Sequence, residues 1–194
     1  MLTREIDKSL YESYSDDIPQ LLKKIYAARS VTESQLSMAL PGLLKPSFDQ
    51  LNIALDLLQK CIEEDCRILI VGDFDADGAT ASVVAIKALR LMGAKYVDFL
   101  VPNRFKHGYG LSPEIVNEAK LEKEPNLIIT VDNGISSNEG AALARSLGID
   151  VIITDHHLPP EELPDANAII NPNLRGCDFP SKNLAGVGVC FYLF

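Results

Sequence analysis

The spacing of hydrophobic and polar positions changes once along the chain, near residue 62. Before this point apolar side chains recur every three or four positions, in "DIPQLLKKIYAAR" and "PSFDQLNIALDLLQKCIEE". This spacing predicts amphipathic helices, and Pro41, Gly42 and Pro46 separate them. No group of polar residues here points to chemistry. We therefore predict a helical N-terminal arm over residues 1–62.

From residue 63 onward, short apolar runs alternate with segments of helical spacing. The runs "RILIVG", "KYVDFLVP", "NLIITVD", "IDVIIT" and "NAIIN" predict strands. One helix should begin at Ser112 and Pro113, and another at a capping box of Ser136 and Glu139. Repeated strand–helix units predict an α/β fold, an open and mostly parallel sheet with helices on both faces. We expect this domain to cover residues 63–194.

The last residues, "NLAGVGVCFYLF", form an apolar stretch in which Gly186 and Gly188 mark the expected start of a helix. No polar tail or helix-stopping residue follows. Because a natural end should not leave so much apolar surface uncovered, we expect the α/β domain to be truncated at its C-terminal side.

Composition narrows the setting of the protein. No run approaches the ~20 apolar residues that cross a bilayer, and "MLTREIDKSLYESYSDD" lacks the apolar core of a signal peptide. A cytoplasmic location follows as the expectation. The four cysteines show no CxxC spacing, which favours structural thiols over a zinc site. The net charge of −9 should repel phosphate at long range, although bound divalent cations can reverse that sign locally.

Polar residues gather directly after four of the predicted strands. Because ligands of an open parallel sheet bind at the carboxyl ends of its strands, we expect these side chains to meet at one edge. They are Asp73, Asp75 and Asp77; Asn103, Arg104, Lys106 and His107; Asp132 and Asn133; and Asp155, His156 and His157.

Each of these groups also has a structural interpretation. Aspartate after a strand is a common helix N-cap, adjacent histidines can be ordinary loop residues, and "NRFKHGYG" can be a solvated basic loop. Three aspartates at alternate positions repel one another, however, and hard divalent cations would offset that repulsion. Together with a second aspartate and a histidine from other strands, the donor set suits Mn²⁺ or Mg²⁺.

Three known motifs fit less well. An EF-hand loop requires an acid at its twelfth position, where this chain has Val84. A phosphatase of the haloacid-dehalogenase type needs a threonine where this chain has Ala79, so it stays as the weaker alternative. Neither GxGxxG nor GxxxxGK follows the strand.

The motifs "VGDFDADGAT", "TVDNGI" and "TDHH", in this order, resemble those of the DHH phosphoesterase superfamily. Within it, "VPNRFKHGYGLSPEIV", "INPN" and "LAGVGVCFYL" resemble the RecJ-type single-stranded-DNA-specific exonucleases. The resemblance runs from about residue 17 to the last residue. It implies a metal-dependent enzyme that degrades single-stranded DNA from the 5′ end, in DNA repair and recombination. Single-strand-binding protein and repair helicases are implied as partners.

The resemblance also implies a role for each site residue. Two Mn²⁺ or Mg²⁺ ions would be held by four side chains: Asp75 on the first ion, Asp77 and His156 on the second, and Asp132 between both. His157 would act with Asp132 in catalysis by facing the scissile phosphate.

The surrounding residues have supporting roles in this scheme. Asp155 would orient a histidine, and Asp73 would either support the site or bind metal. Contacts to nucleic-acid phosphates are implied for Asn103, Arg104, Lys106 and His107. Tyr109 could stack a base or pack in the core.

Two departures limit what the resemblance carries. Val71 stands where many superfamily members have a histidine. A further metal-binding aspartate and a second domain would lie beyond Phe194, so we expect this chain alone to have weak or no nuclease activity. Three alternatives stay open: a phosphodiesterase of short oligonucleotides or cyclic dinucleotides, an inorganic pyrophosphatase, and a catalytically inactive DHH-fold scaffold.

Overall fold

The computed structural model describes residues 4–37, 42–103 and 105–194, and the chain forms two compact units that divide between Lys45 and Pro46. The first unit contains helices α1 (Lys8–Ser13) and α2 (Gln20–Ala27) and the 3-10 helix η1 (Glu33–Leu36). Asp7 caps α1 by accepting a hydrogen bond from the backbone of Leu10. The helical character expected for this part of the chain is confirmed.

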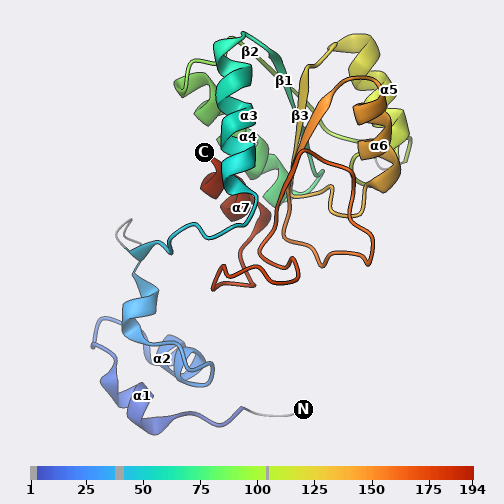
Figure 1. Cartoon of the computed structure of the whole chain (residues 1–194). Coiled ribbons are helices and arrows are strands. Elements are labelled where there is room, and N and C mark those ends of the chain that lie inside the picture. Colours follow the sequence, from blue (N-terminus) through green and yellow to red (C-terminus); the bar gives the residue numbers. More distant parts are fainter. Residues whose placement is uncertain (1–3, 38–41, 104) are drawn as a thin grey trace. The chain divides into compact units, whose positions relative to one another are not determined.

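The second unit is an α/β domain with five parallel strands in the order β2-β1-β3-β4-β5 (Figure 1). All five predicted strands are present, and every pair is parallel. The strands are β1 (Arg67–Gly72), β2 (Tyr96–Leu100), β3 (Leu127–Val131), β4 (Asp150–Thr154) and β5 (Ala168–Ile170). The helices are α3 (Leu51–Glu63), α4 (Ala76–Leu91), α5 (Pro113–Glu122), α6 (Asn138–Ser146) and α7 (Gly186–Leu193).

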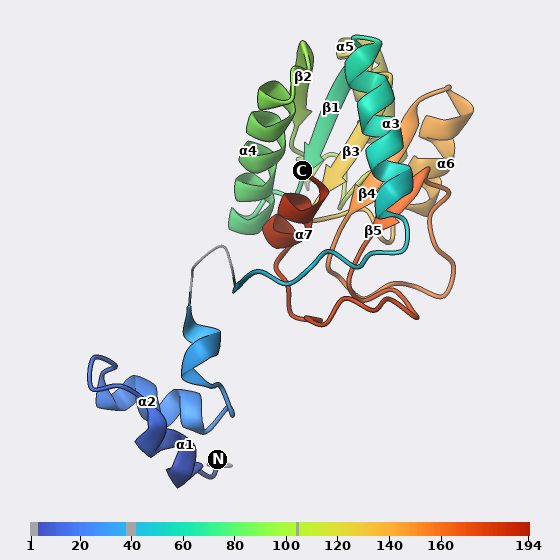
Figure 2. The same ribbon diagram turned by 60° about the vertical axis from the view of Figure 1, so that its left-hand side comes forward.

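Helices cover both faces of the sheet, as predicted (Figure 2). Ile68 and Ile70 of β1 face a cluster built by α3, α4 and α7. Leu69 and Val71, the alternate residues, face a second cluster built by α5 and α6. This alternation explains why β1 reads as one continuous apolar run, since both of its faces are buried.

The boundary expected at residues 62 and 63 differs from the division between the compact units. Helix α3 belongs to the α/β unit, because Ala54, Leu58 and Cys61 are buried in the cluster that covers the sheet. The helical spacing of this segment was interpreted correctly, but its apolar face packs on the sheet and not on the arm.

The start of α6 also differs from the prediction. Ser137 is its N-cap, and the Ser137 hydroxyl accepts a hydrogen bond from the Leu111 backbone at 3.0 Å, so no capping box with Ser136 and Glu139 forms. Helix α5 begins as predicted, with Ser112 capping and Pro113 as first residue. Among the described residues, no helix has both the length and the apolar character needed to cross a membrane.

Candidate metal centre

The carboxyl ends of β1, β3 and β4 bring three aspartates into one row. Gly72 pairs with Val131, and Val131 pairs with Thr154, so the residue after each strand lies at the same level. Asp73 donates its backbone N–H to Val131, and Asp132 donates to Thr154, at 3.3 and 3.0 Å. The convergence predicted from topology is therefore present for Asp73, Asp132 and Asp155.

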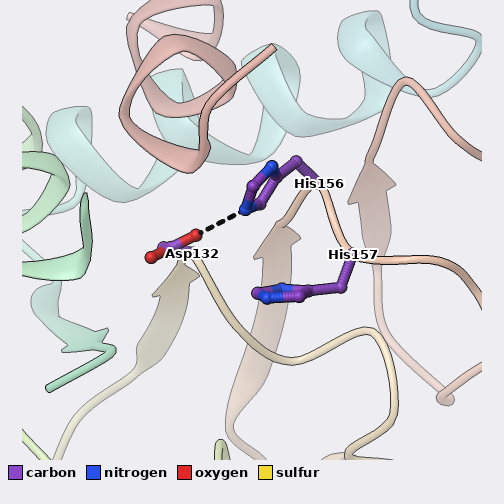
Figure 3. Close-up of side chains that lie close together, drawn as sticks. All are labelled: Asp132, His156 and His157. Atoms are coloured by element: carbon purple, nitrogen blue, oxygen red, sulfur yellow. Dashed lines mark ion pairs between the residues drawn. The ribbon is translucent and has the colours of Figure 1, made fainter. Parts of the chain in front are cut away.

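Two groups of possible metal ligands share Asp132. In the first, Asp73, Asp75 and Asp132 each offer a carboxylate oxygen, and in the second Asp132 is joined by His156 and His157; within each group these atoms lie within 4.8 Å of one another. His156 Nε2 is 3.1 Å from Asp132 Oδ1 and 3.8 Å from Oδ2 of Asp77 (Figure 3). Asp132 thus stands where one side chain can contact two neighbouring ions.

The surroundings of Asp132 leave its charge uncompensated. Its side chain is 2% exposed, and Oδ1 accepts no hydrogen bond from the described part of the chain. Burial, followed by the negative charges of Asp77 and Asp75, raises the pKa of Asp132 to about 7. Its backbone is left-handed, with φ at 64°, a conformation that is strained for a residue other than glycine. A buried acid in this state fits a position that binds a cation.

Asp75 combines the structural and the functional interpretation. Its Oδ1 accepts hydrogen bonds from the backbone of Asp77 and Gly78 at 2.9 and 3.0 Å, so it is the N-cap of α4. No hydrogen bond to Oδ2 is found among the described residues, which leaves this oxygen for a cation. The cap fixes the side chain at the mouth of the row.

Asp155 organises the segment that carries both histidines. Its Oδ1 accepts hydrogen bonds from the backbone of His156 and His157 and lies 2.7 Å from His157 Nδ1. Its Oδ2 accepts from the backbone of Ile135 at 2.9 Å. Burial lowers the pKa of His157, but the hydrogen bond to Asp155 and the charges of Asp155, Asp132 and Asp73 outweigh it, and the pKa is raised. Since Nδ1 is engaged, Nε2 is the nitrogen left to contact a substrate.

The loop after β2 differs from the expected set of phosphate contacts. His107 is buried: its Nδ1 accepts from the Asn103 backbone at 3.2 Å, and its Nε2 lies 3.1 Å from Oε2 of Glu118. Asn103 uses its side chain to accept from Phe105. Both residues therefore hold the loop together and against α5. Lys106 is exposed beside Glu118, and Arg104 lies outside the described residues.

Tyr109 contributes more to the site than the sequence indicated. Burial raises the pKa of its hydroxyl, and the charges of Asp73, Asp155 and Asp132 and a hydrogen bond with Asp73 raise it further. Its ring meets that of His157 edge-on, with centroids 6.1 Å apart. Tyr109 therefore links the loop to the row of aspartates. Val71, where a histidine was considered, is fully buried in the core.

The donor set fits divalent cations. Carboxylate oxygens dominate, one or two imidazoles complete the set, and the acids raise each other's cost of ionisation. Oxygen-rich sites with some imidazole suit Mn²⁺ and Mg²⁺. The orphaned oxygen of Asp132, shared by both groups, is the feature that such ions would satisfy.

Comparisons with known proteins support this geometry. The model described as the DHH family, N-terminal domain, matches residues 67–194. The chain is 51% identical over 192 residues to the single-stranded-DNA-specific exonuclease RecJ of Escherichia coli strain K12, covering 98% of this chain and 33% of that protein. For RecJ of Bacillus subtilis strain 168 the identity is 48% over 140 residues, covering 72% and 18%. The chain thus spans about a third, or less, of the length of these relatives.

Solved structures show the same relationship. A crystal structure of exonuclease RecJ bound to manganese is 36% identical, with a TM-score of 0.68, over 78% of this chain and 38% of that one. RecJ of Thermus thermophilus in complex with Mn²⁺ is 29% identical, with a TM-score of 0.69, over 95% and 26%.

Proposed function

Because this chain belongs to the DHH family, we propose that it carries the metal-binding half of the active site of an exonuclease that degrades single-stranded DNA from the 5′ end. The observation that supports this most directly is the buried Asp132, shared by two groups of metal ligands from three different strand ends. The relatives named as single-stranded-DNA-specific exonucleases supply the substrate class. The proposed setting is DNA repair and recombination in the cytoplasm.

The proposed cofactor is a pair of Mn²⁺ or Mg²⁺ ions, the metals named for related RecJ structures. When bound, such ions offset the negative charge that develops on a phosphoryl group under attack. Asp75 and Asp132 would hold the first ion, and Asp77, Asp132 and His156 the second. With a net charge of −9, the chain needs these cations before a phosphate can approach its carboxylates.

The chain's own residues would then place the scissile phosphate. Asp155 holds His157 through Nδ1, and the raised pKa of His157 favours the form with a proton on both nitrogens. Nε2 can therefore donate a hydrogen bond to a phosphate oxygen. Lys106 is the exposed cation of the neighbouring loop that remains a candidate contact to the DNA backbone.

The two histidines should separate in a metal titration. His156→Ala is expected to weaken Mn²⁺ binding at least tenfold, since its Nε2 lies between Asp77 and Asp132. His157→Ala should change the affinity by less than about threefold, because the Asp155 hydrogen bond directs this ring to a substrate role. Isothermal titration calorimetry measures both. Equal losses in the two variants would contradict the assignment of His157 to the phosphate.

The substrate class is tested with DNA labelled at one end. With Mn²⁺, we expect slow release of the label from a single strand labelled at its 5′ end, no release from a blunt duplex, and none by the Asp132→Asn variant. Fluorescence anisotropy of a labelled oligonucleotide separates binding from hydrolysis. Release that persists in EDTA would contradict metal-dependent chemistry, and faster turnover of a cyclic dinucleotide than of a long strand would favour the small-substrate alternative.

A further inference from the structure

The first turn of α7 is capped by a carboxylate from the metal centre. Gly186 donates its backbone N–H to Asp77 Oδ2, and Val187 donates to Asp77 Oδ1, both at 2.7 Å. The N-cap residue, Ala185, has no side chain that could accept these bonds. The unpaired N–H groups at the start of the helix are therefore satisfied by a residue 109 positions earlier in the chain.

Gly186 also lies directly against Asp132. A Cβ atom added to Gly186 would lie 2.1 Å from Asp132 Oδ1 and 2.5 Å from its Cγ. Both distances are far below van der Waals contact, so even an alanine would have to move the carboxylate or the helix. The backbone angle of Gly186 is not in the left-handed region, so glycine is needed here for space. Figure 3 shows the ribbon of α7, in faint red, near Asp132 and His156.

The helix cannot easily withdraw to make room. Val189, Cys190 and Leu193 of α7 are buried in the cluster that includes α3 and α4. Cys190 Sγ donates to the backbone oxygen of Ala81 in α4 at 3.4 Å, and burial raises the pKa of this thiol to about 12. A side chain at position 186 would therefore displace the acids more readily than the helix.

We propose that Gly186 is a positioning residue of the metal centre. Its lack of a side chain lets α7 lie against Asp132, and its N–H, together with that of Val187, fixes both oxygens of Asp77. Each Asp77 oxygen accepts one N–H and keeps a second lone pair for a cation. The positive end of the helix offsets part of the repulsion among the acids. This inference rests on the proposed function, because it assigns Asp77 and Asp132 to the metals.

Gly186→Ala tests the proposal, and Gly188→Ala in the same helix is its matched control. A Cβ at Gly188 would meet the side chain of Leu184, 2.5 Å from Cδ1, and this flexible group can rotate away. We expect Gly186→Ala to weaken Mn²⁺ binding 10- to 100-fold, the usual effect of losing support behind a metal ligand, and Gly188→Ala to stay within about threefold. Calorimetry gives the affinity, and the electron paramagnetic resonance spectrum of bound Mn²⁺ reports the change in ligand geometry.

Circular dichroism and thermal unfolding show that both variants keep the fold. If the wild-type chain binds Mn²⁺ and Gly186→Ala binds it equally well with the same spectrum, the positioning role is wrong and the proposed function stands. If the wild-type chain binds no Mn²⁺, the proposed function fails and this inference fails with it.

A second measurement uses the wild-type chain alone and does not depend on a variant that folds. Amide hydrogen exchange followed by NMR should show protection of Gly186 and Val187, although they are the first two residues of a helix and have no partner within it. Exchange of both amides at the rate of an unprotected chain would show that the bonds to Asp77 are absent and would overturn the proposal.

Discussion

Replacing Asp132 with asparagine is expected to abolish Mn²⁺ binding and, at the same time, to stabilise the metal-free protein at pH 8. Asparagine keeps the size of the side chain but cannot bridge two cations as a carboxylate does. The loss of affinity should exceed 100-fold, because Asp132 belongs to both groups of ligands.

The gain in stability follows from the raised pKa of Asp132. Burial and the neighbouring acids lift this pKa from its usual 3.8 to about 7 in the folded protein. The folded state therefore holds the proton more tightly than the unfolded state, and the free energy of unfolding decreases as the pH rises from about 4 to about 7. Above this window the ionised carboxylate costs at most about 4 kcal/mol. Asparagine removes that cost, and we expect a gain of roughly 1–3 kcal/mol.

Urea unfolding of the metal-free chain at pH 5 and pH 8, with Asp165→Asn as an exposed control, measures this effect. The wild type should be less stable at pH 8 relative to Asp132→Asn than at pH 5. An Asp132→Asn variant that binds Mn²⁺ normally, or that loses stability at pH 8, would contradict the role of Asp132 as an uncompensated metal ligand.

Asp155→Ala should have the largest destabilising effect. Asp155 is 1% exposed and accepts hydrogen bonds from the backbone of Ile135, His156 and His157. Alanine would leave three backbone N–H groups without their partner, and each such buried group costs about 1–3 kcal/mol, less where water enters. We expect the free energy of unfolding to decrease by about 3–4 kcal/mol.

The same variant should weaken Mn²⁺ binding, because the segment that places His156 loses its anchor. Urea denaturation and calorimetry give the two quantities, and Asp165→Ala in the following loop is the exposed control. A loss of less than about 1 kcal/mol would show that Asp155 does not organise the two histidines.

Much of the fold could be predicted because its strands are buried on both faces. Apolar runs such as "RILIVG" predicted the strands, and topology then placed Asp73, Asp132 and Asp155 at one edge. Helical spacing, by contrast, shows that a helix has an apolar face but not what that face contacts. For this reason α3 was assigned to the arm, although Leu58 packs on the sheet.

The parts of the site that escaped prediction depend on contacts between distant segments. Nothing local to His107 shows that its ring is buried beside Glu118. Tyr109 was left between base stacking and core packing, because its proximity to Asp73 and His157 arises only in the folded chain. Gly186 acts through a backbone N–H and a missing side chain, and neither of these has a signal in hydropathy or charge.

The central claim, a pair of divalent cations bridged by Asp132, is tested most directly by anomalous diffraction from crystals of this chain soaked in Mn²⁺. Two anomalous peaks about 3.5–4 Å apart, with an Asp132 oxygen between them and His156 beside one, are the expected result. Peaks that avoid Asp132, or a protein saturated with Mn²⁺ elsewhere while this edge of the sheet stays empty, would contradict it.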